Sequence, residues 1–140
     1  MPKNTAIQLM KKYNTNNPFE LAEHKKINVV TRALHEDIGG FYLYMRKSQY
    51  IFLNSSLSEE ETFFVGAHEL GHALQHTRVS TPFLRKKTLF SVDKIEVEAN
   101  KFAVELLMPD CLLQEYIHLS IYDIAKILMV PREVVYLKKF

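Results

Sequence analysis

The stretch Ala67–His76 reads AHELGHALQH, and it decides how the rest of the chain is interpreted. It holds three histidines, His68, His72 and His76, each four residues from the next. Residues four apart on a helix lie about 40° apart around the axis, so His68 and His72 present their imidazoles to the same side. Two imidazoles at this spacing can hold one zinc ion. The alternative is a surface helix that matches the pattern by chance.

The other two polar residues of this stretch are expected to play different roles. Glu69 lies about 100° around the helix from His68, which is too far for an equal ligand but close enough to reach a water on the ion. We therefore predict that Glu69 is the general base. His76 lies about 12 Å along the axis from His68 and cannot share the same ion. It is expected to end the helix or to line a cleft.

The helix that carries the motif has its own start signal. Ser58 and Glu61 have the spacing of a capping box, and the acidic first turn complements the helix dipole. The helix is expected to run to about His76. Gly71 is unusual in a helix interior, and it indicates either close approach by another backbone or simple helix packing.

A third ligand is expected on the next helix, within DKIEVEANKFAVELLMP at 93–109. With about 100° per residue, Ile95, Ala99, Phe102 and Leu106 share one buried stripe. Glu98 falls instead in a charged stripe that is expected to be solvated, and this stripe also holds Lys94, Lys101 and Glu105.

Glu96 falls at the edge of the buried stripe, where an unpaired carboxylate would be costly. We therefore predict Glu96 as the third ligand, with Glu98 as the second choice. Asn100 follows one turn later on the same edge. It is predicted to hydrogen-bond the distal nitrogen of a metal-bound histidine, although a solvent-facing position is the alternative.

Outside these helices the pattern predicts a small α+β fold. INVVTRAL at 27–34, GFYLYMRK at 40–47 and YIFLN at 50–54 indicate about three short, mainly antiparallel strands. A first helix is expected over Thr5–Tyr13, and a second one capped by Asn17, with Glu20 completing a capping box. Two or three short helices are expected after Pro109.

Composition limits the class of protein. A chain of 140 residues that is 47% hydrophobic is expected to form a single domain over 1–140. The formal net charge of +2 does not favour nucleic-acid binding. Cys111 is the only cysteine, which excludes an internal disulfide. The sequence has neither a signal peptide pattern nor a membrane-spanning run, so the cytoplasm is the expected location.

The chain resembles the ImmA/IrrE family of small zinc metallopeptidases. The resemblance rests on HELGHALQH at 68–76 and EVEANKFAVELLMP at 96–109, with support from YNTNNPFELAEHKKINV and YIFLN. It implies a zincin-like fold with one zinc ion, held by His68, His72 and Glu96, and Glu69 as the catalytic glutamate. It also implies a prophage or mobile-element setting, in which a helix-turn-helix repressor is cut and repression is relieved.

Two other functions remain open at this point. One is a regulatory module that binds a repressor without cutting it, although a pure binding protein has no need of Glu69. The other is a nucleic-acid contact through the C-terminal SIYDIAKILMVPREVVYLKKF, which carries few basic residues. For the peptidase, an extended substrate is expected to add to an edge strand, with YIFLN as the candidate. The loop Thr77–Phe90 is expected either to recognise substrate or to be a mobile surface loop.

Overall fold

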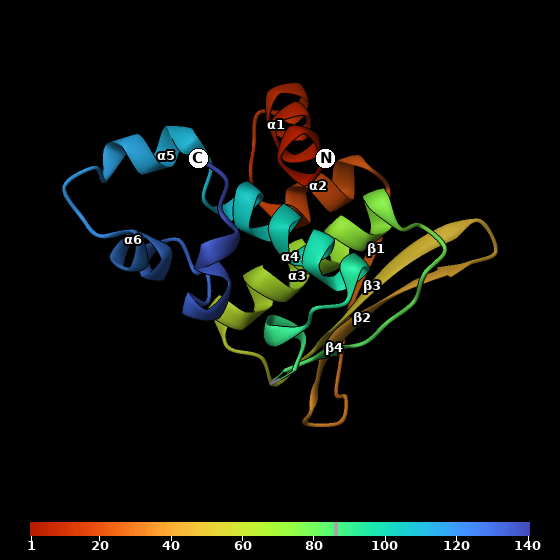
Figure 1. Cartoon of the computed structure of the whole chain (residues 1–140). Coiled ribbons are helices and arrows are strands. Elements are labelled where there is room, and N and C mark those ends of the chain that lie inside the picture. The colour runs from red at the N-terminus through yellow and green to blue at the C-terminus, as the bar shows by residue number, and fades with distance from the viewer. Residues whose placement is uncertain (86) are drawn as a thin grey trace.

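The computed structural model describes residues 1–85 and 87–140, so Lys86 lies outside the described residues (Figure 1). One helix, α3, packs against the sheet, and a second, α4, packs against α3. The helices are α1 Pro2–Tyr13, α2 Pro18–His24, α3 Glu59–Gln75, α4 Lys94–Leu107, α5 Asp110–Glu115 and α6 Ile121–Ile127, with 3-10 turns η1 Thr88–Phe90 and η2 Arg132–Leu137. The strands are β1 Asn28–Arg32, β2 Ile38–Met45, β3 Ser48–Asn54 and β4 Phe83–Leu84. The predicted α+β class is confirmed.

The described strands form a sheet in the order β1-β3-β2-β4. β2 pairs antiparallel with both β3 and β4, and the sequence therefore predicted the main hairpin correctly. Two features differ from the prediction: β1 runs parallel to β3, and the two-residue β4 adds a fourth strand. β4 carries no detectable pattern because two residues are too few to show an alternation.

The interior position of β3 corrects the expected site for an extended substrate. YIFLN forms most of β3, which is flanked by β1 on one side and by β2 on the other. Its backbone hydrogen-bonding groups are therefore used within the sheet. The edges of the described sheet are β1 and β4, and only β4 lies in the segment between α3 and α4.

Both ends of α3 are held by specific hydrogen bonds. At its start the predicted capping box is present: Glu61 N–H donates to Ser58 Oγ at 3.2 Å, and Ser58 N–H donates to Glu61 Oε1 at 3.0 Å. Beyond its last turn, the buried Tyr42 of β2 donates its hydroxyl to the Thr77 carbonyl at 2.7 Å. The sheet thus holds the end of the helix that carries the motif.

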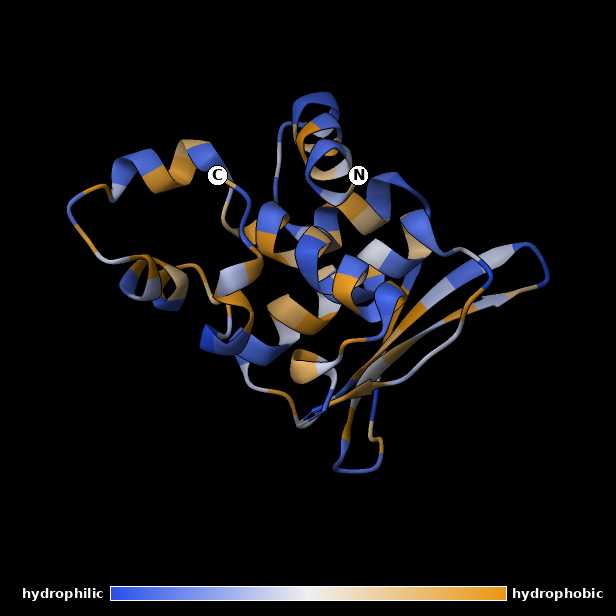
Figure 2. Ribbon diagram, viewed as in Figure 1, coloured by the Kyte–Doolittle hydropathy of each residue, from blue (hydrophilic) through white to orange (hydrophobic). Residues whose placement is uncertain are grey.

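Gly71 lets α4 approach α3 closely. A Cβ at this position would lie 3.0 Å from Phe102 Cδ1 and 3.3 Å from Phe102 Cβ. The contact is with a side chain of α4 and not with its backbone, so the helix-packing interpretation of Gly71 is correct. Figure 2 shows hydrophobic segments along both helices where they pack together.

The C-terminal segment folds back over α4 and corrects the prediction for Glu105. This carboxylate was expected to be solvated, but it is buried at 3% exposure. Lys138 Nζ, also buried, donates to Glu105 Oε1 at 2.6 Å, and Lys139 N–H donates to Glu105 Oε2 at 2.8 Å. The angular argument assumed that this face of α4 meets water, whereas residues 132–140 cover it. Asp110 accepts a second contact from Lys138 at 2.9 Å.

Side chains also cap two of the shorter helices. Asn17 caps α2 by accepting from Phe19 N–H and Glu20 N–H, but Glu20 accepts from the Thr15 hydroxyl and does not complete a capping box. Ser120 caps α6 by accepting from Asp123 N–H. No helix among the described residues is both long enough and apolar enough to cross a membrane.

The buried pair gives a stability prediction. Changing Lys138 to Met should lower the free energy of unfolding by about 3–5 kcal/mol, because Glu105 is left as a buried charge without its cation. Urea denaturation measures this change. Lys139→Met is the matched control, since that side chain is exposed, and it should change stability by less than about 0.5 kcal/mol. The double variant Glu105→Leu/Lys138→Met should recover most of the loss. Equal stability of Lys138→Met and Lys139→Met would contradict the prediction.

Candidate metal centre

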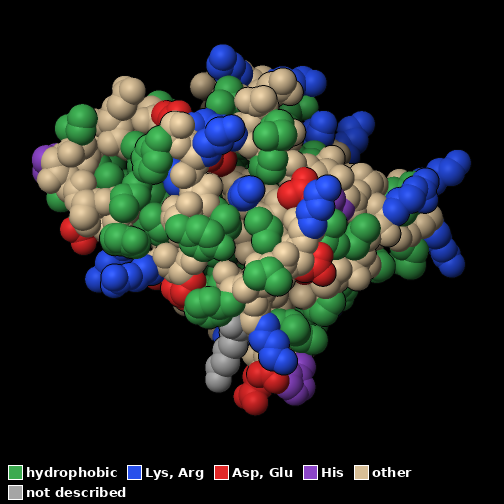
Figure 3. Space-filling view, viewed as in Figure 1, with side chains coloured by type: hydrophobic (Ala, Val, Ile, Leu, Met, Phe, Trp, Pro, Cys, Tyr) green, Lys and Arg blue, Asp and Glu red, His purple; other side chains and the backbone are tan. Residues whose placement is uncertain are grey.

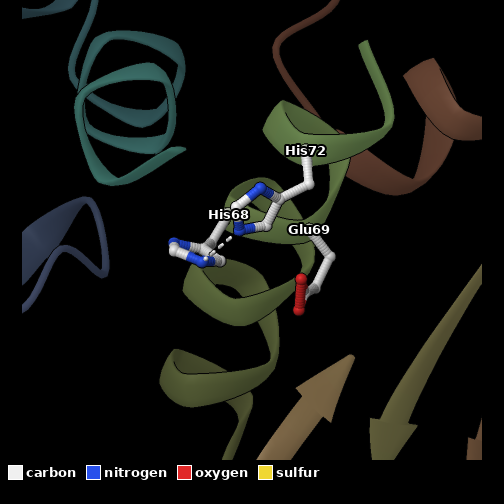
Figure 4. Close-up of side chains that lie close together, drawn as sticks. All are labelled: His68, Glu69 and His72. Atoms are coloured by element: carbon white, nitrogen blue, oxygen red, sulfur yellow. Dashed lines mark hydrogen bonds between the residues drawn. The ribbon is translucent and has the colours of Figure 1, made fainter. Parts of the chain in front are cut away.

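Three side-chain atoms from two helices converge at the interface of α3 and α4. His68 Nε2 lies 3.1 Å from His72 Nε2, and Glu96 Oε1 lies 3.1 Å from the first and 2.6 Å from the second. All three residues are buried, with exposures of 0%, 1% and 5%. Figure 4 shows the imidazoles of His68 and His72 side by side on one face of α3. The helical spacing therefore brings the predicted histidines together, and packing of α4 brings Glu96 to them.

The size and chemistry of this triangle suit a divalent transition metal. Four ligands arranged tetrahedrally about 2.0–2.1 Å from zinc are separated from each other by about 3.3 Å. Two of the three distances here, both 3.1 Å, are close to that value, and the third, 2.6 Å, is shorter. Imidazole nitrogen and carboxylate oxygen are both zinc ligands. Three electron-pair donors this close together repel one another unless a proton or a cation lies among them. The residues present thus fit a metal ion.

A hydrogen-bonded chain orients His68. Its Nδ1 lies 2.8 Å from Asn100 Oδ1, and Asn100 Nδ2 donates to the Thr88 carbonyl at 3.1 Å. The carbonyl fixes the orientation of the amide, so the Asn100 oxygen must accept and His68 Nδ1 must carry the proton. This tautomer leaves the electron pair of His68 on Nε2, toward Glu96 and His72.

Glu69 lies beside this triangle without joining it. Its side chain is 0% exposed, and neither carboxylate oxygen has a hydrogen-bond partner among the described residues. Figure 4 shows the Glu69 side chain leaving α3 beside the two imidazoles, on the side of the helix where the strands lie. Burial, followed by the nearby charge of Glu96, raises the pKa of Glu69 well above its usual range. A buried carboxylate without a partner among the described residues is costly, and such groups are common at functional sites.

Either glutamate can be grouped with the two histidines. Ligand atoms of His68, Glu69 and His72 all lie within 4.8 Å of one another. The Glu96 oxygen lies closer, at 3.1 Å and 2.6 Å from the two Nε2 atoms. Because Glu96 already contacts both rings and Glu69 contacts neither by a hydrogen bond, the geometry favours Glu96 as the third ligand.

The protonation states match that arrangement. Burial would by itself raise the pKa of Glu96, but its close contacts with His68 and His72 outweigh burial and lower the pKa to about 2. Burial also lowers the pKa of His68, partly offset by its contact with Glu96. A neutral imidazole and an ionised carboxylate are the forms that bind metal.

Several contacts at the site have no clear signal in the sequence. The ring of Phe83 on β4 packs edge-on against His68 with 4.9 Å between centroids. The Thr88 carbonyl is a backbone group, which any residue could supply. His76 was placed correctly at the end of α3, but its contact with His72 was not foreseen. Glu98 lies 3.7 Å from His76 and is separate from the three converging atoms.

A cleft of about 690 Å³ opens beside Glu96. The segment between α3 and α4 lines it with Pro82, Leu84, Phe90 and Val92. Phe90 and Val92 are 68% and 94% exposed, which is unusual for large apolar side chains. The described part of the loop Thr77–Phe90 therefore contributes β4, η1 and an apolar cleft wall next to the candidate metal centre.

Comparison with known proteins identifies relatives. Residues 22–138 match the family model described as IrrE N-terminal-like domain, Peptidase_M78. "Uncharacterized immunity region protein 2" of Bacillus phage phi105 is 52% identical over 136 residues, which is 95% of this chain and 86% of that protein. "Metallopeptidase ImmA" of Bacillus subtilis (strain 168) is 32% identical over 114 residues. The match covers 81% of this chain and 66%, slightly under two thirds, of ImmA.

The Glu69 carboxylate, which has no hydrogen-bond partner among the described residues, is expected to lower the stability of the metal-free protein. Glu69→Gln should raise the free energy of unfolding of the metal-free protein by about 1–3 kcal/mol, because it removes a buried group that ionises. Because the pKa is higher in the folded than in the unfolded chain, wild type loses stability as the pH rises, and the advantage of Gln should grow from acidic to neutral pH. Urea denaturation with excess chelator measures it. A less stable Glu69→Gln protein at neutral pH would contradict this prediction.

Proposed function

The chain belongs to the Peptidase_M78 family of IrrE N-terminal-like domains, and on that premise we propose that it is a zinc-dependent endopeptidase with a narrow protein substrate. The family and the relation to a metallopeptidase support the class of enzyme. The convergence of His68 Nε2, His72 Nε2 and Glu96 Oε1 carries the assignment of the site.

In this proposal His68, His72 and Glu96 hold one zinc ion. Zinc bound there would act as a Lewis acid toward a water molecule and the scissile carbonyl. Two nitrogen ligands and one oxygen ligand suit zinc better than magnesium or calcium, which prefer oxygen alone. Asn100 holds His68 in the tautomer that leaves Nε2 free, and it positions the ligand without contacting the ion.

Glu69 is the proposed general base. Its carboxylate has no hydrogen-bond partner among the described residues and is therefore free to accept a proton from the attacking water. The same carboxyl group then returns the proton to the leaving amine when the peptide bond breaks. A pKa raised by burial makes Glu69 a stronger base than an exposed glutamate, which suits both steps.

We propose that the substrate is an extended segment of a helix-turn-helix repressor, whose cleavage relieves repression. The cleft beside Glu96 supports a peptide substrate, because Phe90 and Val92 can contact apolar side chains on it. The relative named as a phage immunity-region protein and the relative named ImmA support the choice of a repressor. A repressor substrate also places the proposed action in the cytoplasm.

Two other functions are less well supported. A module that only binds a repressor has no use for Glu69, because a buried carboxylate with no hydrogen-bond partner among the described residues lowers stability. For nucleic acid, the face in Figure 3 carries Lys and Arg side chains that are spread out and interrupted by neutral and acidic groups. In the C-terminal segment, Lys138 is buried against Glu105 and is not free to contact phosphate. We also propose that residues 1–140 act as one metallopeptidase domain, because residues 132–140 pack on α4.

Zinc binding tests the ligand set. Glu96→Gln should lose zinc on dialysis and His68→Ala should lose it as well, because each removes a donor atom. Glu98→Gln changes the second-choice ligand and should keep nearly one equivalent per chain. Metal analysis after dialysis gives the stoichiometry. Retention of zinc by Glu96→Gln with loss by Glu98→Gln would show that the wrong glutamate had been chosen.

Incubation with a purified candidate helix-turn-helix repressor tests the activity. Glu69→Gln should lower the cleavage rate by about 10²–10⁴-fold while zinc remains bound, because the variant keeps the ligands and loses the base. Mass spectrometry of the products, with Glu60→Gln as control, gives the rate and the bond that is cut. Cleavage by Glu69→Gln at the wild-type rate would exclude this mechanism. Relief of repression by both proteins with an intact repressor would favour the binding module.

A further inference from the structure

Of the two histidines proposed as metal ligands, His76 contacts the one that Asn100 does not reach. Its Nδ1 lies 3.1 Å from His72 Nδ1, and the two ring centroids are 5.2 Å apart. The side chain of His76 is 10% exposed, at the C-terminal end of α3. On its other side, His76 Nε2 lies 3.7 Å from Glu98 Oε1 on α4. His76 therefore sits between a proposed ligand and a carboxylate.

The contacts that link His72, His76 and Glu98 allow hydrogen bonds to be donated in one direction only, from His72 toward Glu98. For His72 to turn the electron pair of Nε2 toward Glu96 and His68, its proton must be on Nδ1. That proton can be donated only if His76 Nδ1 accepts it, which places the His76 proton on Nε2. Nε2–H then faces Glu98, whose carboxylate favours a proton on that side. The position of the proton on His72 therefore fixes the position of the proton on His76.

From this geometry we propose that His76, oriented by Glu98, is a positioning residue for His72. It serves His72 as Asn100 serves His68, and α4 supplies both Glu98 and Asn100. The inference rests on the proposed metal site. It adds that the zinc affinity depends on a residue two turns beyond His68 that does not touch the ion.

A purely structural role for His76 makes a different prediction. A residue that only ends α3 would change the stability of the metal-free protein and leave the zinc affinity of the folded protein unchanged. A positioning residue changes the zinc affinity, and a side chain that supplies an acceptor at the place of Nδ1 restores it. Asparagine is such a side chain, because its Oδ1 lies at about the same distance from the backbone as histidine Nδ1.

The experiment compares His76→Leu with His76→Asn in the full chain. Zinc dissociation constants come from competition with a chromophoric chelator, and urea denaturation of the metal-free proteins is measured beside them. His76→Leu should bind zinc about 10–100-fold more weakly than wild type, and His76→Asn within about threefold of it. Glu98→Gln should weaken binding by roughly two- to fivefold, because its contact is longer and partly exposed. His118→Leu changes an exposed histidine and should have no effect.

A spectroscopic signature checks the proposed tautomer. In the zinc-loaded wild type, nitrogen NMR of the ring should place the proton of His72 on Nδ1, protected from exchange with solvent. In His76→Leu that proton should exchange faster. A proton on Nε2 of His72 in the zinc-loaded wild type would overturn the inference.

The outcomes separate this inference from the proposed function. If wild type binds no zinc, the metal site itself fails. If wild type binds zinc and His76→Leu binds it equally well, only the role of His76 fails. A loss of tenfold or more in His76→Asn would also overturn the inference, because that variant keeps the acceptor, and this result stands even if His76→Leu does not fold.

Discussion

Three electron-pair donors from two helices meet in a buried space between α3 and α4, and the local structure depends on how that meeting is stabilised. His68, His72 and Glu96 lie at most 5% exposed, with 2.6–3.1 Å between their ligand atoms. Such an arrangement is unfavourable without a proton or a cation among the donors. Contacts away from the three donors hold the helices in place. Phe102 of α4 packs against Gly71 of α3, and the Tyr42 hydroxyl donates to the Thr77 carbonyl just after α3.

Each of the two histidines has a polar partner at its distal ring nitrogen. Asn100, tied to the Thr88 carbonyl, faces the distal nitrogen of His68, and His76 faces that of His72. Both partners are positioned by groups of α4 or of the segment just before it. The same packing therefore sets the position of each proposed ligand and the tautomer in which it can bind. Glu69 is different, because it has no hydrogen-bond partner among the described residues, which suits the general base that we propose.

The segment between α3 and α4 links this centre to the surface. Phe83 of β4 packs on His68, Thr88 holds Asn100, and Phe90 and Val92 line the cleft beside Glu96. A substrate that rests on this wall would therefore lie on the same segment that contacts the proposed metal ligand His68 and its partner Asn100. The edge strand of the sheet in this region is β4, because β3 is enclosed by its two neighbours. The C-terminal segment acts on the opposite end of α4, where Lys138 neutralises Glu105.

The sequence by itself determined features that depend on spacing along one helix or strand. It predicted α3 with its capping box, the shared face of His68 and His72, the offset of Glu69, and the edge position of Glu96 on α4. These predictions hold because helical geometry relates neighbours by fixed angles. Only the tertiary structure decided that Glu105 is buried under Lys138, that β1 runs parallel, that β4 exists, and that His76 contacts His72. Each depends on which face of an element another segment covers, and such contacts leave no periodic signal in the chain.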